Sequence, residues 1–236
     1  MKNRLLNFSF RHASILLLLC FVFLILGFVT LSLSEETKPL ILVALGDSTT
    51  AGTPGFRSPR EKPPSGQGDE RSQYAYWMMK RRPEWKVINQ GINGQRSDQI
   101  LNRFDTDVLP YKPDVVIVLA GVNDLYQGYS AERVKKNLEA IYARAREAKI
   151  GVLACTILPY NAMNSTVKAR MLEVNEWIKN YSDEQGFGFC DTYRVVEDPN
   201  RPSNLAGSPD GLHPDIEGYR KMGEAIADIL ESRLLT

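Results

Sequence analysis

Five short apolar runs, separated by longer segments of helical periodicity, constrain the fold of this chain more than any other feature. The runs are continuous rather than alternating, which is typical of parallel strands that helices cover on both faces. They lie at residues 40–45, 86–89, 115–119, 151–157 and 186–190. Repeated strand–helix units predict one α/β domain, a three-layer α/β/α sandwich of the flavodoxin-like type around a five-stranded parallel sheet.

Three amphipathic patterns predict the longest helices. In the first, apolar residues recur at helical spacing from Val134 to Ala145, after a cap at Ser130. A second pattern begins near residue 167 and stops at Gly186, and a third covers residues 215–230. We expect these apolar stripes to pack against the sheet.

Small and polar residues follow three of the predicted strands. Gly46-Asp47-Ser48 ends the first strand, Gly91 follows the second and Asn123 follows the third. Sheets of this kind bind ligands beyond the carboxyl ends of their strands, so these residues are expected to converge at one edge. A serine after a strand can also simply cap a helix, and Ser48 needs partners before it indicates chemistry.

One histidine stands out as a partner for Ser48. The chain has only two histidines, and His12 lies in an apolar, basic N-terminal segment. If Ser48 is a nucleophile with a histidine base, that base is therefore His213. Asp210 is the nearest carboxylate that could orient the imidazole.

Four short motifs, in order, make the chain resemble the SGNH hydrolases, also called GDSL lipases and esterases. The motifs are Gly46-Asp47-Ser48, Gly91-x-Asn93-Gly94, Gly121-x-Asn123-Asp124 and Asp210-x-x-His213. The resemblance covers about residues 40–232 and departs from the family label at Thr49, where leucine is common. It implies the SGNH hydrolase fold and a serine esterase that uses no cofactor or metal.

The resemblance also implies a role for each site residue. Ser48 would attack an acyl carbonyl, His213 would accept its proton and then protonate the leaving group, and Asp210 would hold the imidazole tautomer. The oxyanion would be bound by the backbone N–H groups of Ser48 and Gly91 and by the side-chain amide of Asn123.

Three charged residues near these motifs have different expected roles. Asp47 and Asp124 are expected to be structural and to bind backbone near the site. Arg96 follows the Gly91–Gly94 turn, where it can pair with Asp98 or be solvated. Alternatively, it can contact an anionic group of the substrate or fix the oxyanion loop.

Residues 53–70 interrupt the strand–helix rhythm directly after the Ser48 turn. They hold four prolines, three glycines and six charged side chains. This composition predicts no regular element. We expect the segment to form one wall of the substrate cleft.

The first 34 residues predict a membrane anchor or a signal segment. Lys2, Arg4 and Arg11 precede an apolar stretch at residues 15–33, which is just long enough to span a bilayer. We expect a retained single span with the domain at residues 35–236 outside the cytoplasm. The alternative is a cleaved signal and a secreted or periplasmic domain.

Composition argues against several classes of protein. The formal net charge is +1, and three of the basic residues lie in the N-terminal segment, so the remainder shows no basic footprint for nucleic acid. Cys155 and Cys190 lie in apolar runs and are interpreted as buried thiols, although a disulfide is possible outside the cell. One usable histidine and two isolated cysteines cannot build a common zinc site.

The sequence therefore predicts an enzyme that cleaves an ester or thioester through an acyl-enzyme. Lipid, lysophospholipid, thioester and acetylated-glycan substrates all fit, because a triad does not choose the acyl or leaving group. An acyltransferase of the same family that acts on a glycan is the nearest competing function. Two non-catalytic functions also stay open: an exported ligand-binding module without turnover, and a phosphate-binding flavodoxin-like domain.

Overall fold

The computed structural model describes residues 38–234, and the predicted N-terminal segment lies outside these residues. All five predicted strands are present and form one sheet in the order β4-β1-β5-β6-β7, with every neighbouring pair parallel. The strands are β1 (Ile41–Gly46), β4 (Lys86–Gly91), β5 (Val115–Leu119), β6 (Gly151–Cys155) and β7 (Gly188–Cys190). The predicted α/β fold with a five-stranded parallel sheet is confirmed.

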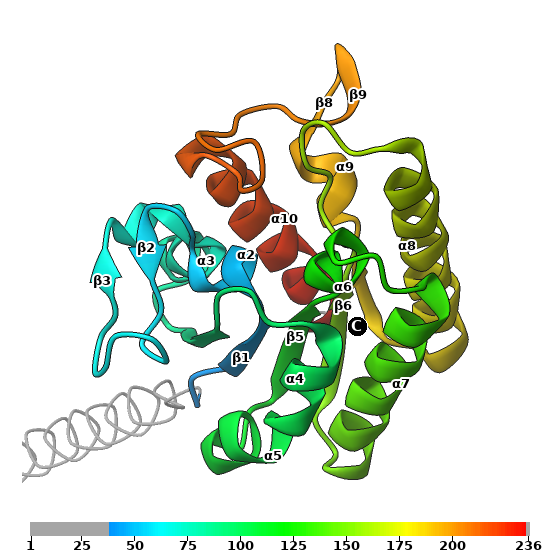
Figure 1. Cartoon of the computed structure of the whole chain (residues 1–236). Coiled ribbons are helices and arrows are strands. Elements are labelled where there is room, and N and C mark those ends of the chain that lie inside the picture. The colour runs from blue at the N-terminus through cyan, green and yellow to red at the C-terminus, as the bar shows by residue number, and fades with distance from the viewer. Residues whose placement is uncertain (1–37, 235–236) are drawn as a thin grey trace, which may run out of the picture. The chain divides into compact units, whose positions relative to one another are not determined.

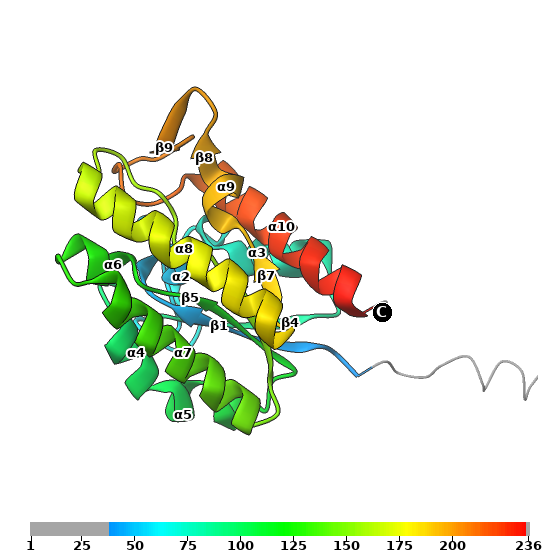
Figure 2. The same cartoon turned by 90° about the vertical axis from the view of Figure 1, so that its right-hand side faces the viewer.

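Helices lie on both sides of this sheet (Figures 1 and 2). The α-helices are α2 (Ser48–Ala51), α3 (Tyr74–Arg81), α4 (Ser97–Asn102), α5 (Phe104–Asp107), α6 (Val122–Tyr126), α7 (Ala131–Glu147), α8 (Ser165–Gln185), α9 (Thr192–Val196) and α10 (Ile216–Leu234). Two 3-10 turns, η1 (Glu70–Ser72) and η2 (Leu109–Tyr111), complete the helical elements of the described residues.

Alternate residues of each strand enter two separate cores. Val43 and Leu45 of β1 pack in a cluster with residues of α4, α5, α7 and α8. Leu42 and Ala44 point to the opposite face, in a cluster with residues of α3 and α10. Both faces of the central strands are therefore buried, which explains why their sequences are continuous apolar runs.

Local signals place the helix ends as predicted. The Ser130 hydroxyl accepts a hydrogen bond from the Arg133 N–H and caps α7. Gly186 ends α8 with a φ of 68°, the left-handed conformation that favours glycine. The free thiols of Cys155 and Cys190 are buried at paired positions of β6 and β7, as interpreted from the sequence.

The prediction that residues 53–70 hold no regular element is wrong. β2 (Phe56–Arg57) and β3 (Gln67–Gly68) pair antiparallel in a small hairpin, and the Phe56 ring is buried. A second hairpin, β8 (Glu197–Asp198) with β9 (Arg201–Leu205), was not predicted. Both hairpins lie outside the main sheet, where strand-like apolar alternation is not needed.

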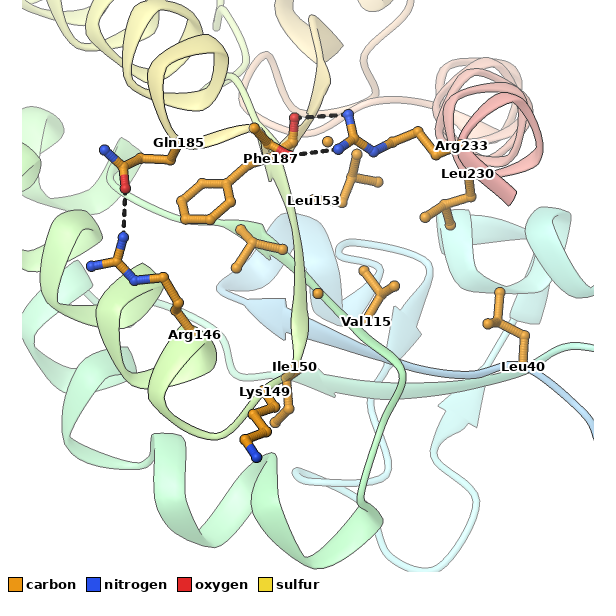
Figure 3. A pocket seen from close by; sticks show the side chains of 14 residues that line it. Leu40, Val115, Arg146, Lys149, Ile150, Leu153, Gln185, Phe187, Leu230 and Arg233 are labelled. Carbon is orange, nitrogen blue, oxygen red and sulfur yellow. Dashed lines mark hydrogen bonds between the residues drawn. The ribbon is translucent and has the colours of Figure 1, made fainter. Parts of the chain in front are cut away.

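A hollow of about 470 Å³ lies at the amino ends of β6 and β7. Figure 3 shows the side chains that line it. Basic side chains stand around its apolar floor, where the carboxyl ends of α7 and α8 also lie. Arg146 donates to Gln185, and Arg233 donates to the carbonyls of Gly186 and Phe187 (Figure 3). These cations complement the negative ends of the helix dipoles. The hollow lies at the edge of the sheet opposite Ser48.

The long apolar stretch of the sequence is not among the described residues. Within residues 38–234, no helix is long and apolar enough to cross a membrane.

Candidate active site

A tight strand-to-helix turn presents Ser48. β1 ends at Gly46, Asp47 caps the short helix α2, and Ser48 is the first residue of that helix. Gly46 is required by packing, because a Cβ there would lie 2.1 Å from the Thr50 hydroxyl oxygen and 2.4 Å from the Leu119 carbonyl oxygen. The turn places Ser48 just beyond the carboxyl end of β1, the second strand in the order of the sheet.

Ser48, His213 and Asp210 form one hydrogen-bonded chain. His213 Nε2 lies 2.8 Å from Ser48 Oγ, and His213 Nδ1 lies 2.7 Å from Asp210 Oδ2. The imidazole is buried, with 7% of the residue exposed. The structure thus joins the three residues that were predicted as nucleophile, base and orienting carboxylate.

The second oxygen of Asp210 fixes the loop that carries the histidine. Oδ1 accepts hydrogen bonds from the backbone N–H groups of Leu212 and His213, at 2.9 and 2.8 Å. Burial by itself raises the pKa of Asp210, but hydrogen bonds from the His213 ring, the His213 N–H and the Leu212 N–H outweigh it and lower the pKa. These hydrogen bonds favour the carboxylate form of Asp210 beside the His213 ring.

Gly91 differs from its predicted role as an oxyanion donor. Its N–H donates to Asn89 Oδ1 at 2.9 Å, so that hydrogen is already committed. A Cβ on Gly91 would lie 2.1 Å from the Ala51 nitrogen and 2.5 Å from the Ala51 Cα. Glycine is needed here because α2 packs against β4, and not because substrate approaches the backbone.

Among the described residues, unengaged N–H groups lie instead at Gly94, at Ser48 and on the Asn123 side chain. Gly94 has a φ of 73°, its surroundings are open, and its N–H has no partner among the described residues. The Ser48 N–H likewise has none within residues 38–234. Asn123 donates one amide hydrogen to the Gln95 carbonyl at 2.9 Å, which leaves the second for a ligand.

Two buried aspartates hold the turns that surround these donors. Asp47 accepts the Thr49 N–H at 3.0 Å, and Asp124 accepts both the N–H and the hydroxyl of Ser97 at 2.8 Å. The predicted structural role of Asp47 and Asp124 is confirmed. Burial, with the nearby charge of Asp124, raises the pKa of Asp47 to about 7, against the opposing charge of Arg103.

Residues 53–70 contact the turn formed by Gly91–Gly94. The buried Ser58 hydroxyl donates to the Gly91 carbonyl at 2.5 Å, and Glu61 Oε1 accepts the Asn93 N–H at 3.0 Å. The Thr53 hydroxyl also donates to the Asn93 side chain. Through these contacts, residues 53–70 help to hold the Gly91–Gly94 turn in place.

The comparisons with known proteins agree with this architecture. Residues 44–221 match the GDSL-like Lipase/Acylhydrolase family. The chain belongs to that family. It is therefore a GDSL hydrolase, an enzyme that acts on ester bonds, as the motifs predicted.

Several relatives of this GDSL hydrolase are esterases. An acetylxylan esterase from Geobacillus stearothermophilus is 24% identical over 156 residues, which cover 59% of this chain and 69% of that protein. A multidomain esterase from Ruminococcus flavefaciens is 27% identical over 133 residues, which cover 52% of this chain and 16% of that protein.

Solved structures share the fold. A lipolytic protein of the G-D-S-L family from Desulfitobacterium hafniense DCB-2 is 26% identical with a TM-score of 0.67, and the match covers 80% of this chain and 98% of that one. A catalytic mutant of the acetylxylan esterase Axe2 from Geobacillus stearothermophilus superposes with a TM-score of 0.66 over 81% of this chain and 94% of that one. At 19% identity, this second likeness concerns the fold alone.

Arg96 stands beside the site of the GDSL hydrolase but is engaged by protein groups. Its guanidinium pairs with Asp98 at 3.1 Å, contacts Gln127 and lies over the Tyr129 ring. Of the roles left open by the sequence, the structure shows the pairing with Asp98. No group of three His, Cys, Asp or Glu side chains among the described residues is placed to hold a metal ion.

Proposed function

We propose that this GDSL hydrolase cleaves carboxylic esters through a covalent acyl-enzyme formed on Ser48. The observation that carries the proposal is the 2.8 Å contact between His213 Nε2 and Ser48 Oγ, continued to Asp210. Ser48 Oγ bonds to the acyl carbon while its proton passes to His213. The tetrahedral intermediate then expels the alcohol, which takes the proton from His213. Water repeats both steps and releases the acid.

The oxyanion is proposed to bind three donors at the carboxyl edge of the sheet. These are the N–H groups of Ser48 and Gly94 and the second amide hydrogen of Asn123. Each of these hydrogens is without a partner among the described residues. Gln95 links Gly94 to Asn123, because it follows Gly94 in the chain and its carbonyl accepts from the Asn123 amide. Donors of this kind are typically worth roughly 10²–10³ in turnover.

For the substrate, we propose a short acyl ester of a carbohydrate. The acetylxylan esterase among the relatives supports this choice. A second support is Tyr126, which is 62% exposed and lies one helical turn after Asn123, on the same side of α6. Its ring meets Tyr160 edge to face at 5.8 Å, and the next residue, Asn161, is bonded to Gly211 of the Asp210–His213 loop. An exposed ring held in this way offers a flat apolar face with a polar tip to a sugar.

The triad is tested with Ser48→Ala, His213→Ala and the double variant. Because the members act as a unit, all three variants should lose similar amounts of kcat. A fluorophosphonate probe should label the native enzyme and fail on both single variants. Near-normal hydrolysis by His213→Ala at neutral pH would contradict the mechanism, and an unlabelled native enzyme would favour a ligand-binding module without turnover.

The substrate class is tested by comparing acetylated xylo-oligosaccharides with 4-nitrophenyl esters of increasing chain length. Tyr126→Ala should raise KM for the oligosaccharide more than for 4-nitrophenyl acetate. Leu172→Ala, which removes an exposed apolar side chain from α8, is the control. Equal effects of Tyr126→Ala on all esters would refute the carbohydrate assignment. Release of acyl groups to an added sugar instead of water would identify an acyltransferase.

We also propose that the domain acts outside the cytoplasm, held by or released from the apolar N-terminal stretch at residues 15–33. Fractionation of the tagged full-length chain tests this. Recovery with membranes indicates an anchor, a shortened soluble species outside the cytoplasm indicates a cleaved signal, and recovery of the full chain in the cytoplasm refutes export.

A further inference from the structure

A buried arginine behind the site has no role in the mechanism described so far. Arg103 lies between α4 and α5, and only 8% of the residue is exposed. Its guanidinium makes four hydrogen bonds with donor–acceptor distances of 2.6–2.8 Å. Its partners come from separate parts of the chain that all lead to the proposed oxyanion site.

Two of these partners are the ends of neighbouring strands. Nη2 donates to the Gly46 carbonyl at 2.7 Å, two residues before Ser48. Nη1 donates to the Gln90 carbonyl at 2.8 Å, near the end of β4. One planar side chain therefore fixes the carboxyl ends of β1 and β4 relative to each other.

The third partner connects Arg103 to Asn123. Arg103 Nε donates to Gln95 Oε1 at 2.6 Å, and the Gln95 carbonyl accepts from Asn123 Nδ2 at 2.9 Å. Arg103 thus holds the side chain of Gln95, and the backbone carbonyl of Gln95 orients the amide of Asn123. Gly94, whose N–H is a proposed donor, directly precedes Gln95.

The fourth partner, Asp107, neutralises the buried charge. Nη1 lies 2.7 Å from Asp107 Oδ2, and Asp107 is 2% exposed. Burial lowers the pKa of Arg103, while Asp107 opposes that shift. A buried ion pair is often no more stabilising than apolar residues of the same volume. Stability alone therefore gives little reason to bury an arginine here, whereas its fork of donors suits the three acceptors near the site.

We propose that Arg103 and Gln95 are positioning residues of the esterase, which hold the side-chain amide of Asn123 in the geometry that binds the oxyanion. The inference rests on the proposed function. It assigns to these two residues an effect on turnover that operates through Asn123, and not merely an effect on folding.

Gln95→Ala is the first test, because the side chain is only partly buried and its loss leaves both strand-end contacts of Arg103 in place. We expect kcat to fall about 10-fold with little change in KM and in melting temperature, as for loss of a group that couples to its neighbour by a typical amount. Gln185→Ala is a matched control, since Gln185 accepts from Arg146 at the same 2.6 Å but at the opposite edge of the sheet. It should leave kcat unchanged.

A double-mutant cycle with Asn123→Ala separates positioning from structure. If Gln95 acts through Asn123, Gln95→Ala should have almost no further effect on kcat once Asn123 is alanine. Equal losses in both backgrounds, or no loss in either, would overturn the proposal while the esterase mechanism stood. Absence of hydrolysis by the native enzyme would instead remove the proposed function.

Arg103→Lys is the second test. A lysine keeps the charge but cannot reach all four acceptors with one ammonium group. We expect kcat to fall about 100-fold, the loss typical of a small misplacement of catalytic groups. A variant that folds and keeps native kcat would refute the role of the guanidinium. If the variant does not fold, the Gln95 cycle still decides the proposal.

Discussion

Replacing Asp210 by asparagine tests whether Asp210 orients His213 for the proposed mechanism, with little disturbance of the loop. Asp210 Oδ1 accepts from the backbone of Leu212 and His213, and an asparagine oxygen can keep both bonds. The amide NH₂ then takes the place of Oδ2, which lies 2.7 Å from His213 Nδ1. A donor in that position requires Nδ1 to accept, so the ring proton moves to Nε2.

This tautomer is the wrong one for catalysis. Nε2–H would face Ser48 Oγ across the 2.8 Å contact and could not accept its proton. We expect kcat to fall roughly 10⁴-fold, the loss known for such a tautomer error, which equals about 5 kcal/mol of transition-state stabilisation. KM should change little, because the substrate does not contact the carboxylate in this mechanism.

The assay is steady-state hydrolysis of 4-nitrophenyl acetate at pH 7 to 8, with melting temperature as the measure of folding. Ser208→Ala is the control, since its hydroxyl donates to the His213 carbonyl at 2.6 Å, lies 3.5 Å from Asp210 Oδ1 and does not touch the imidazole ring. Ser208→Ala should lower kcat by less than 10-fold. If Asp210→Asn folds normally and retains kcat within 10-fold of the native enzyme, Asp210 does not set the tautomer.

Two further predictions concern the nucleophile turn. Gly91→Ala should lower both melting temperature and kcat, because its Cβ would lie 2.1 Å from the Ala51 nitrogen; overpacking of this kind typically costs about 1–3 kcal/mol, and an unchanged thermal unfolding curve would contradict the packing argument. Asp47→Asn should flatten the pH dependence of stability. The raised pKa of about 7 means that the folded state keeps a proton that the unfolded state loses near 3.8, so the native protein loses stability as pH rises between these values. Melting temperatures from pH 5 to 8 measure this, and parallel curves for the two proteins would show that Asp47 is not the group responsible.

The apolar runs were sufficient to predict the sheet, and the errors at strand ends have local causes. The run at 151–157 continues beyond the end of β6 at Cys155 because Ile157 is still buried. There the side chain of Asn175 accepts from the Ile157 N–H and donates to its carbonyl, and so replaces a neighbouring strand. At the other end of the sheet, Gly186 belongs to the left-handed cap of α8 and not to β7.

The contacts that join Ser48, His213 and Asp210 were predictable, because a chain with one usable histidine leaves little choice of partner for the serine. The remaining site residues were not, because their roles depend on contacts between distant segments. Arg103 lies in a helical segment where a charged side chain is ordinarily solvated, and only the fold brings it to Gly46. The motif that contains Gly91 and Gly94 also does not reveal that the Asn89 side chain accepts the Gly91 N–H and leaves the Gly94 N–H open.

The separation of Ser48 and His213 by 165 residues bears on when the enzyme becomes active. Ser48 begins α2, directly after the first strand of the main sheet, whereas His213 precedes α10. Contacts so distant in sequence form late, because closing a long loop has an entropic cost that only the packed core offsets. α10 supplies part of that core through Tyr219 and Met222, and the Tyr219 hydroxyl donates to the Thr53 carbonyl beside the nucleophile turn. In the proposed mechanism, Ser48 is therefore without its base until α10 has packed against the sheet, so that hydrolysis requires the folding of the domain as a whole.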